Sequence, residues 1–244
     1  MTKENLDRNA LNQPIGFSVS NWKPPPTPVS QTMEGEYCRI EPLNPDLHAA
    51  AIYDANARDT EGINWTYLPY GPFETLDKYF DWMKQSCLGS DPMFFAIIDK
   101  TKGDASGVAS FLNIKQDVGT IEVGHINYSP LLQQTTAATE AMYLMMQYVF
   151  DLGYRRYEWK CNVLNAGSRT AAQRLGFSFE GIFRQAMIAK GRNRDTAWYS
   201  IIDTEWPSLH DAFLRWLEPS NFEKDGKPRT RLSELTAPII EKRD

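Results

Sequence analysis

The sequence has few cysteines and no long apolar run, and each absence excludes a class of protein. Its three cysteines, Cys38, Cys87 and Cys161, are far apart and without metal-ligand spacing, so we expect reduced thiols and no metal site. No apolar stretch approaches the ~20 residues of a membrane span, and the first residues lack the apolar core of a secretion signal. We therefore expect a cytoplasmic protein without a membrane partner.

The chain also lacks an excess of positive charge. Its formal net charge is -5 and its pI is about 5.3, which argues against nucleic acid as the main partner. Acidic loops would instead suit a substrate that carries an amine. With 244 residues, 42% of them hydrophobic, the chain can bury one sizeable core, and we expect one main domain over residues 35–218.

Segments on both sides of this domain have a different composition. Residues 1–34 contain the run "KPPPTP" and show no apolar periodicity, so we expect an extended, proline-rich arm. Disorder is the alternative for this arm. Residues 219–244 are polar, and we expect a tail that wraps the surface.

Apolar spacing predicts helices and strands in a definite order. A strand at residues 36–40 precedes a helix whose N-cap is Asn44 or Asp46, followed by the aromatic stretch "GINWTYLPYGPF". The later elements are a helix at 75–87, strands at 93–99, 106–113 and 120–128, a helix at 137–152, a strand at 157–163, a helix at 168–175, and a hairpin around "KGRNR". A strand-helix-strand crossover added to an antiparallel meander predicts an α/β fold with a mixed, mostly antiparallel central sheet flanked by helices.

The turn "SPLLQQTTAATEA", residues 129–141, joins a strand to the most regular helix and contains no glycine. A helix N-terminus provides unpaired N–H groups and the positive end of the macrodipole, which together suit a phosphate. Simple helix capping by Thr135 or Thr136 is the alternative.

Three segments, "ATEA", "NAGSRTAAQRLGF" and "GRNRDT", carry a resemblance to a known family. From about residue 35 to residue 217 the chain resembles the GNAT superfamily of acyl-CoA N-acyltransferases, and it looks closest to the RimJ/RimL-like branch. The resemblance implies a sheet that splays apart after strand 120–128, with acetyl-CoA as co-substrate between that strand and the parallel strand 157–163. It implies no metal.

The phosphate loop departs from the family's pattern. Gln133 fits the usual Gln or Arg, whereas Gln134 and Thr136 replace two glycines that allow close backbone approach. The side chains of Gln133, Gln134, Thr135 and Thr136 add donors, and we expect these to replace the lost backbone contacts. The residues that the resemblance assigns to the co-substrate are Ile126, Tyr128, Gln133, Gln134, Thr135, Thr136, Ala137, Ala138, Asn165 and Ser168.

The implied reaction is attack of a neutral primary amine on a thioester, which needs a base or a water chain. Glu122 is our first candidate for the base, and its alternative is an ordinary solvent-facing carboxylate. His125 is the second candidate, on the opposite face by strand alternation; a structural histidine is its alternative. The resemblance implies that Ser168 donates to the leaving thiolate and Asn165 to the pantetheine, although Ser168 can also be read as a helix N-cap.

The aromatic loop offers residues for the acceptor side. Trp65, Tyr67 and Tyr70 lie where the resemblance places the substrate wall, but loop aromatics also serve as core plugs. Asp195 would hold a cationic acceptor or pair with Arg192 or Arg194.

These residues lead to one main hypothesis and two alternatives. We expect an N-acetyltransferase that transfers acetyl from acetyl-CoA to a primary amine of a small molecule or a protein N-terminus within a ternary complex. A catalytically silent acyl-CoA-binding protein is the first alternative, and a scaffold protein that docks through its arm is the second. A homodimer is expected on general grounds.

Overall fold

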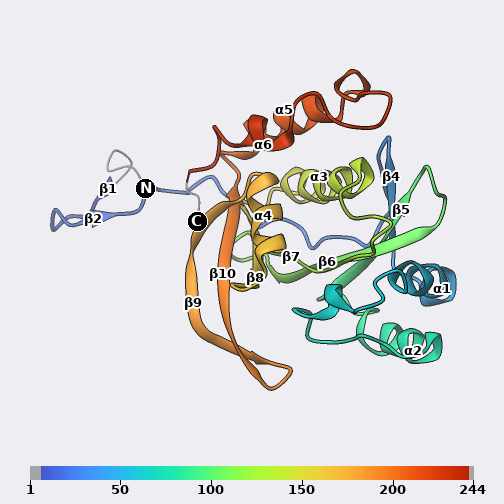
Figure 1. Cartoon of the computed structure of the whole chain (residues 1–244). Helices are drawn as coiled ribbons and strands as arrows, with labels where there is room; N and C mark the ends of the chain where they lie inside the picture. The colour runs from blue at the N-terminus through green and yellow to red at the C-terminus, as the bar shows by residue number, and fades with distance from the viewer. Residues whose placement is uncertain (1–6, 242–244) are drawn as a thin grey trace.

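An eight-stranded sheet forms the centre of the protein, as shown by a computed structural model that describes residues 7–241 (Figure 1). The strands follow the order β3-β4-β5-β6-β7-β8-β10-β9. Their bounds are β3 (Met33–Glu34), β4 (Cys38–Pro42), β5 (Met93–Asp99), β6 (Ala105–Lys115), β7 (Thr120–Tyr128), β8 (Arg156–Asn162), β9 (Ser178–Ala189) and β10 (Arg192–Ile202). Among the described strands, only the β7–β8 pair is parallel, so the predicted mixed, mostly antiparallel sheet is confirmed.

Helices cover both faces of this sheet. The helices are α1 (Pro45–Asn56), η2 (Ile63–Trp65), α2 (Leu76–Ser86), α3 (Thr136–Asp151), α4 (Ala166–Arg174), α5 (Trp206–Leu217), η3 (Pro219–Asn221) and α6 (Leu232–Thr236). One core lies between the sheet and α1 and α2, and a larger core lies on the face covered by α3 and α5 (Figure 1). Of the helices described, none combines the length and apolarity needed to cross a membrane.

Several predicted elements have the expected bounds. The strands at 93–99 and 120–128 match β5 and β7, and the N-cap of α1 is Asn44, whose side chain accepts from the backbone of Asp46. Helix α5 was not predicted, although its apolar residues Trp206, Leu209, Phe213 and Trp216 follow helical spacing and are buried. Within the polar tail, α6 contributes Leu232 to the core.

The sheet splays between β7 and β8. The two strands pair from Thr120–Arg156 to Val123–Trp159, and beyond those residues β7 runs to Tyr128 and β8 to Asn162 without pairing to each other. This gap is the predicted opening after the central strand.

A bulge accompanies the splay and changes the direction of one side chain. The register between β6 and β7 shifts just where His125 adopts a φ of 50°. The prediction that His125 lies on the opposite face from Glu122 is therefore wrong, because the bulge breaks strand alternation. The His125 ring packs against Phe94 in the α1–α2 core, on the side where Glu122 lies.

Glu140 ties α3 to the turn between β3 and β4. Its carboxylate accepts the backbone N–H groups of Glu36, Tyr37 and Cys38 at 2.8, 2.7 and 2.7 Å. A Cβ on Gly35 would lie 2.4 Å from this carboxylate, so any larger residue there would displace it. The glutamate of the "ATEA" segment thus fixes the edge of the sheet.

The N-terminal arm has two parts. A small hairpin of β1 (Asp7–Arg8) and β2 (Pro14–Ile15) projects from the main body (Figure 1). The proline-rich part that follows lies against the main body, where Tyr148 Oη accepts from Val29 N at 2.7 Å and donates to Val29 O at 3.0 Å. The extended conformation of this part is held by side chains of the main domain.

Candidate active site

The N-terminus of α3 faces the splay with unpaired donors. Thr135 is the N-cap, and its hydroxyl accepts from Ala138 N at 3.0 Å. Within residues 7–241, the backbone N–H groups of Gln134, Thr136 and Ala137 have no acceptor. Three unpaired N–H groups at the start of a 16-residue helix form a site for an anion.

Gln134 keeps the backbone conformation that glycine normally provides. Its φ is 61°, in the left-handed region that costs a side chain ~1 kcal/mol or more. The loop therefore retains the shape of a glycine turn without the glycine. Capping by Thr135 is real as well, and it leaves the three neighbouring N–H groups available.

The side chain of Gln133 has a different role from the one the sequence suggested. Its Nε2 donates to Asn64 Oδ1 and to Tyr128 O, both at 2.8 Å. Both amide hydrogens are thus occupied, so the replacement of glycine contacts by Gln133 donors is not supported. Gln133 instead joins the loop to η2.

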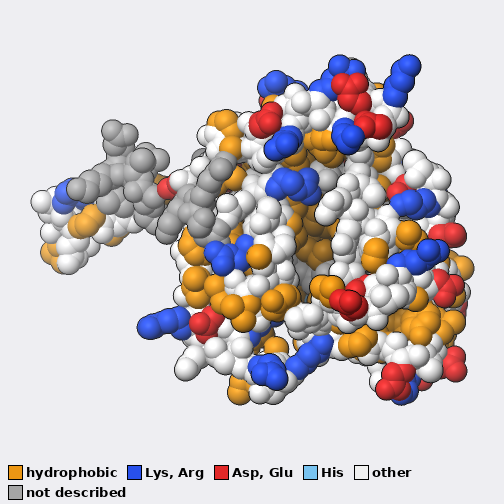
Figure 2. Space-filling view, viewed as in Figure 1, with side chains coloured by type: hydrophobic (Ala, Val, Ile, Leu, Met, Phe, Trp, Pro, Cys, Tyr) orange, Lys and Arg blue, Asp and Glu red, His pale blue; other side chains and the backbone are white. Residues whose placement is uncertain are grey.

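A hollow lies between α3 and α4 (Figure 2). Figure 2 shows hydrophobic side chains on its floor and Lys and Arg side chains at its rim. Ile126 and Tyr128, on the part of β7 that does not pair with β8, pack against the core on this side. The buried Tyr128 hydroxyl has no partner among the described residues. Burial raises the pKa of this hydroxyl, so it is a neutral donor.

Ser168 and Asn165 lie at the start of α4. Asn165, not Ser168, is the N-cap, and its Oδ1 accepts from Ser168 N at 3.0 Å. The Ser168 hydroxyl accepts from Trp159 Nε1 at 3.0 Å. Since Trp159 occupies a lone pair, the hydroxyl hydrogen of Ser168 remains available for another acceptor.

Glu122 is buried, with 6% of its surface exposed, so the interpretation as a solvent-facing carboxylate is wrong. Its Oε2 accepts from Asn113 Nδ2 at 2.7 Å and from Lys160 Nζ at 2.8 Å. Burial raises the pKa of Glu122, and the bonds from Lys160 and Asn113 oppose that rise. The carboxylate is held in one position, with a pKa above its ordinary value.

His125 contacts the aromatic loop. Its Nδ1 lies 3.2 Å from the Tyr70 hydroxyl, and the two rings stack at 5.6 Å. Burial lowers the pKa of His125, so the ring is neutral at pH 7. The structure thus brings His125 and Tyr70 together.

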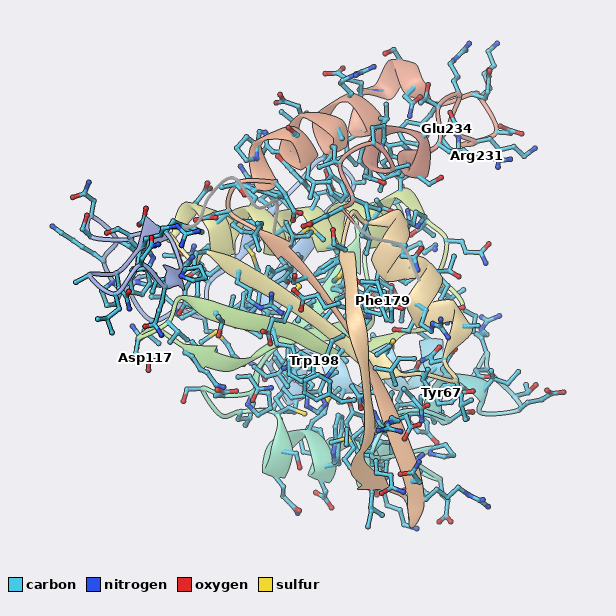
Figure 3. All side chains as sticks on the ribbon, turned by 90° about the vertical axis from the view of Figure 1, so that its left-hand side faces the viewer. Tyr67, Asp117, Phe179, Trp198, Arg231 and Glu234 are labelled. Atoms are coloured by element: carbon cyan, nitrogen blue, oxygen red, sulfur yellow. The ribbon has the colours of Figure 1, made fainter. Side chains whose placement is uncertain are left out.

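Of the other two loop aromatics, only Tyr67 reaches beyond the core. Trp65 is buried and packs edge-on against Phe73 and Tyr79, so it is a core plug. Tyr67 donates to Leu164 O at 3.0 Å and lies on the loop that passes below α4 and beside the β9–β10 hairpin (Figure 3).

Asp195 makes neither of its expected ion pairs among the described residues. Its Oδ1 accepts from Gln185 N at 2.7 Å and from Asn193 Nδ2 at 3.0 Å, and these bonds lower its pKa. Asp195 therefore closes the bulge of the hairpin, where it also lines a pocket of about 720 Å³.

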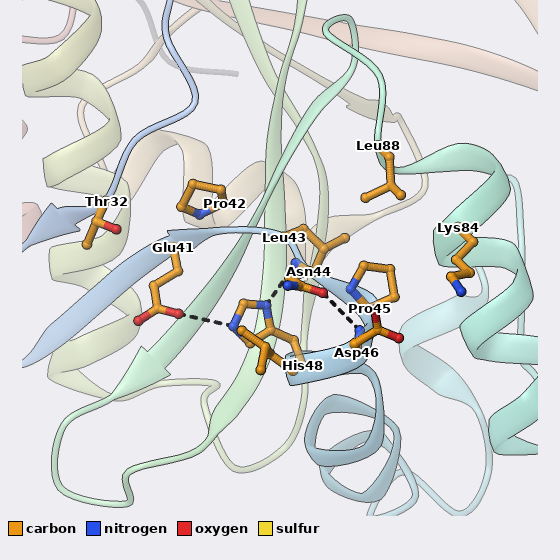
Figure 4. A pocket seen from close by; sticks show the side chains of 11 residues that line it. Thr32, Glu41, Pro42, Leu43, Asn44, Pro45, Asp46, His48, Lys84 and Leu88 are labelled. Carbon is orange, nitrogen blue, oxygen red and sulfur yellow. Dashed lines mark hydrogen bonds and ion pairs between the residues drawn. The ribbon is translucent and has the colours of Figure 1, made fainter.

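A second pocket, of about 480 Å³, lies between β4, α1 and α2 (Figure 4). His48 in this pocket lies 3.1 Å from Glu41 and accepts from Asn44 N at 3.1 Å. Strands β5 and β6 separate β4 from β7, so this pocket is apart from the splay.

Sequence reasoning missed several residues of the site. Lys160 bridges two carboxylates, Asn113 holds Glu122, and Trp159 orients Ser168. The alternation of β8 indicated that Trp159 and Lys160 point to opposite faces of the sheet, but the residues that they bond, Ser168 and Glu122, come from other segments. Only the strand register could have found them.

A splayed mixed sheet with an anion-binding helix N-terminus beside the gap defines a class of acyl-group transferases, and the comparisons with known proteins agree. The family model described as an acetyltransferase (GNAT) domain matches residues 38–178. A GCN5-related N-acetyltransferase from Brucella melitensis is 45% identical, with 90% of this chain and 100% of that chain covered and a TM-score of 0.87. The chain belongs to the GNAT acetyltransferase family.

Other solved structures are more distant. A probable acetyltransferase of the GNAT family from Chromobacterium violaceum is 39% identical, with 80% and 98% of the two chains covered and a TM-score of 0.74. The microcin C7 self-immunity acetyltransferase MccE, solved with acetyl-CoA and AMP, is 22% identical, covers 69% of this chain and 93% of its own, and has a TM-score of 0.60; it shares the fold. Comparison with curated proteins gave no match.

Proposed function

We propose that the protein is an N-acetyltransferase of the RimJ/RimL-like branch that transfers acetyl from acetyl-CoA to a primary amine of a small molecule or a protein N-terminus. The transfer is direct attack within a ternary complex. The observation that carries this proposal is the gap between β7 and β8 with three unpaired N–H groups of α3 beside it.

The residues around the gap suit acetyl-CoA. The N–H groups of Gln134, Thr136 and Ala137 would hold the pyrophosphate, and the part of β7 that does not pair with β8 would offer backbone groups of Ile126 to the pantetheine. The Oδ1 of Asn165 caps α4, so its amide hydrogens remain available to the pantetheine. Acetyl-CoA supplies a thioester whose leaving group, a thiolate with a pKa near ~8.5, departs readily.

Two groups can take the amine proton. Glu122 is fixed through its Oε2 by Lys160 and Asn113, and its Oε1 would take the proton directly or through water. His125 is neutral and lies on the same face beside Tyr70. We assign the base to Glu122 because its raised pKa brings it closer to the working pH than an ordinary carboxylate.

Ser168 is the proposed donor to the departing thiolate. Trp159 fixes the Ser168 oxygen and leaves its hydrogen free to point outward. Cys161 is buried on its strand, so we propose no acyl-enzyme step.

The test measures thiol release from acetyl-CoA with a broad panel of amines. In Ser168→Ala we expect turnover to fall roughly ten- to a hundredfold, as when one preorganised donor to a good leaving group is lost, with CoA affinity kept. Thr170→Ala, an exposed position on the same helix, is the matched control. Unchanged turnover in Ser168→Ala would remove Ser168 from the mechanism, and CoA binding without turnover on any amine would favour the silent acyl-CoA-binding alternative.

A further inference from the structure

The charged residues beside Glu122 form a connected network. Lys160 Nζ lies 2.8 Å from Glu122 and 2.8 Å from Glu158, and Arg156 binds both Glu158 and Glu180. The network therefore contains two cations, Lys160 and Arg156, and three carboxylates, and it carries one excess negative charge when all of them are ionised. Lys160 is further covered by Trp198, whose ring lies 3.9 Å from the ammonium.

Arg194 lies on the same face of the sheet but outside this network. Its Nε donates to Thr196 Oγ1 at 3.3 Å, and no carboxylate within residues 7–241 forms an ion pair with it. The side chain is half-buried, and burial lowers its pKa. A guanidinium has five N–H donors, so most of those of Arg194 are unused.

A second donor without a partner lies nearby. Trp198 is four residues from Arg194 along β10, on the same strand face, and its Nε1 is buried without an acceptor among the described residues. A buried donor that lacks an acceptor costs free energy, so Trp198 Nε1, on the same strand face as the half-buried Arg194 guanidinium, indicates that a ligand supplies acceptors there.

Strand register locates these donors relative to the gap. Trp198 pairs with Lys160 and Thr196 with Asn162 at the end of β8. Arg194 therefore lies two residues further toward the hairpin tip than the end of β8. An amine beside Glu122 and an anion beside Arg194 would occupy the two ends of one binding site.

The aromatic loop is bonded to segments on both sides of this site. Lys190, at the hairpin tip, donates to Trp65 O at 2.8 Å and Gly71 O at 2.9 Å, while Tyr67 of the same loop bonds Leu164 O after β8. Residues 62–73 are thus joined to the hairpin on one side and to the β8–α4 connection on the other. Because the loop is held on both sides, we infer a small molecule rather than a polypeptide chain at this site.

We propose that the acetyl acceptor is a small zwitterion, a primary amine that carries a carboxylate or phosphate, and that Arg194 binds its anionic group. This inference rests on the proposed acetyltransferase function and specifies its substrate class. The negative excess around Glu122 attracts the ammonium form, and Arg194 recognises the anion with its planar fork.

The experiment compares acceptors that differ only in the anionic group. Thiol release from acetyl-CoA is measured with common L-amino acids against their C-terminal amides, with O-phosphoethanolamine against ethanolamine, and with short peptides that carry a free N-terminus. The two matched pairs distinguish a carboxylate from a phosphate. Arg194→Gln is compared with Arg192→Gln, an exposed arginine of the same hairpin, and CoA affinity is measured for each protein.

We expect the anionic member of at least one pair to have a kcat/KM at least tenfold above that of its neutral partner. Arg194→Gln should abolish this preference through KM, without changing CoA affinity, and Arg192→Gln should keep it. Equal use of both members, preferred use of peptides, or equal effects of the two variants would overturn the inference while leaving the acetyltransferase function intact. No thiol release with any amine would instead overturn the proposed function, and with it the inference.

Discussion

Glu140 gives the sharpest test of how the fold is held. Replacing it by Gln leaves the shape of the side chain but removes its charge and one acceptor oxygen. A hydrogen bond to a charged group contributes about 1.5–3 kcal/mol. One amide oxygen can still accept from Tyr37 and Cys38, whereas the new amide group opposes the N–H of Glu36.

The expected loss is therefore about 2–4 kcal/mol of the free energy of unfolding. For a chain of this size, roughly 2–4 °C of melting temperature corresponds to each kcal/mol, so Glu140→Gln should melt roughly 5–15 °C below the parent. Thermal unfolding followed by circular dichroism measures this difference. Faster hydrogen exchange at the amides of Glu36, Tyr37 and Cys38 should accompany it.

Glu36→Gln is the matched control, since Glu36 belongs to the same turn and its side chain is exposed. Its melting temperature should stay within about 2 °C of the parent value, as for most surface substitutions. If Glu140→Gln melts no lower than Glu36→Gln, the three hydrogen bonds do not stabilise the protein and the reasoning is refuted.

Two further predictions concern the α3 loop and the base. Gln134→Gly should keep or improve CoA affinity measured by calorimetry, and it should change the free energy of unfolding by less than about 1 kcal/mol, because it removes left-handed strain but adds entropy to the unfolded chain. Gln134→Val should weaken CoA binding in the same measurement. If Gln134→Gly binds CoA more weakly than Gln134→Val, the Gln134 side chain itself binds the ligand. For the base, the carboxylate of Glu122 forms only above its raised pKa, so the parent kcat/KM should fall as pH falls through that value. Relative to the parent, Glu122→Gln should lose most activity above that pKa, where the parent carboxylate is ionised, and least below it. A profile parallel to the parent's would remove Glu122 as the base, and a shift of the acidic limb in His125→Gln would assign it to His125.

The sequence predicted the parts of the fold that depend on periodicity. Strands β5 and β7 and helix α2 follow from apolar spacing. The face of His125 could not be predicted, since a bulge against β6 changes the alternation, and a bulge depends on the partner strand. The environment of Glu122 was equally hidden, because Asn113 and Lys160 come from neighbouring strands.

Among the polar residues, local roles could be predicted from the sequence and long-range roles could not. Thr135 was predicted as a possible cap and is one, since capping is a local property. Asn165 rather than Ser168 caps α4, a shift of three residues that spacing alone does not resolve. Gln133 and Asp195 bond to segments that only the folded chain brings near them.

The left-handed turn at Gln134 has a consequence for the way such proteins are found. A sequence motif that consists of glycines indicates a backbone conformation, because glycine is the residue that adopts that conformation most easily. This chain keeps the left-handed conformation but has glutamine in place of glycine, so a sequence search for the glycines alone would reject it. Searching for a positive φ ahead of a helix with unpaired N–H groups would detect acyl-CoA turns that have lost every glycine.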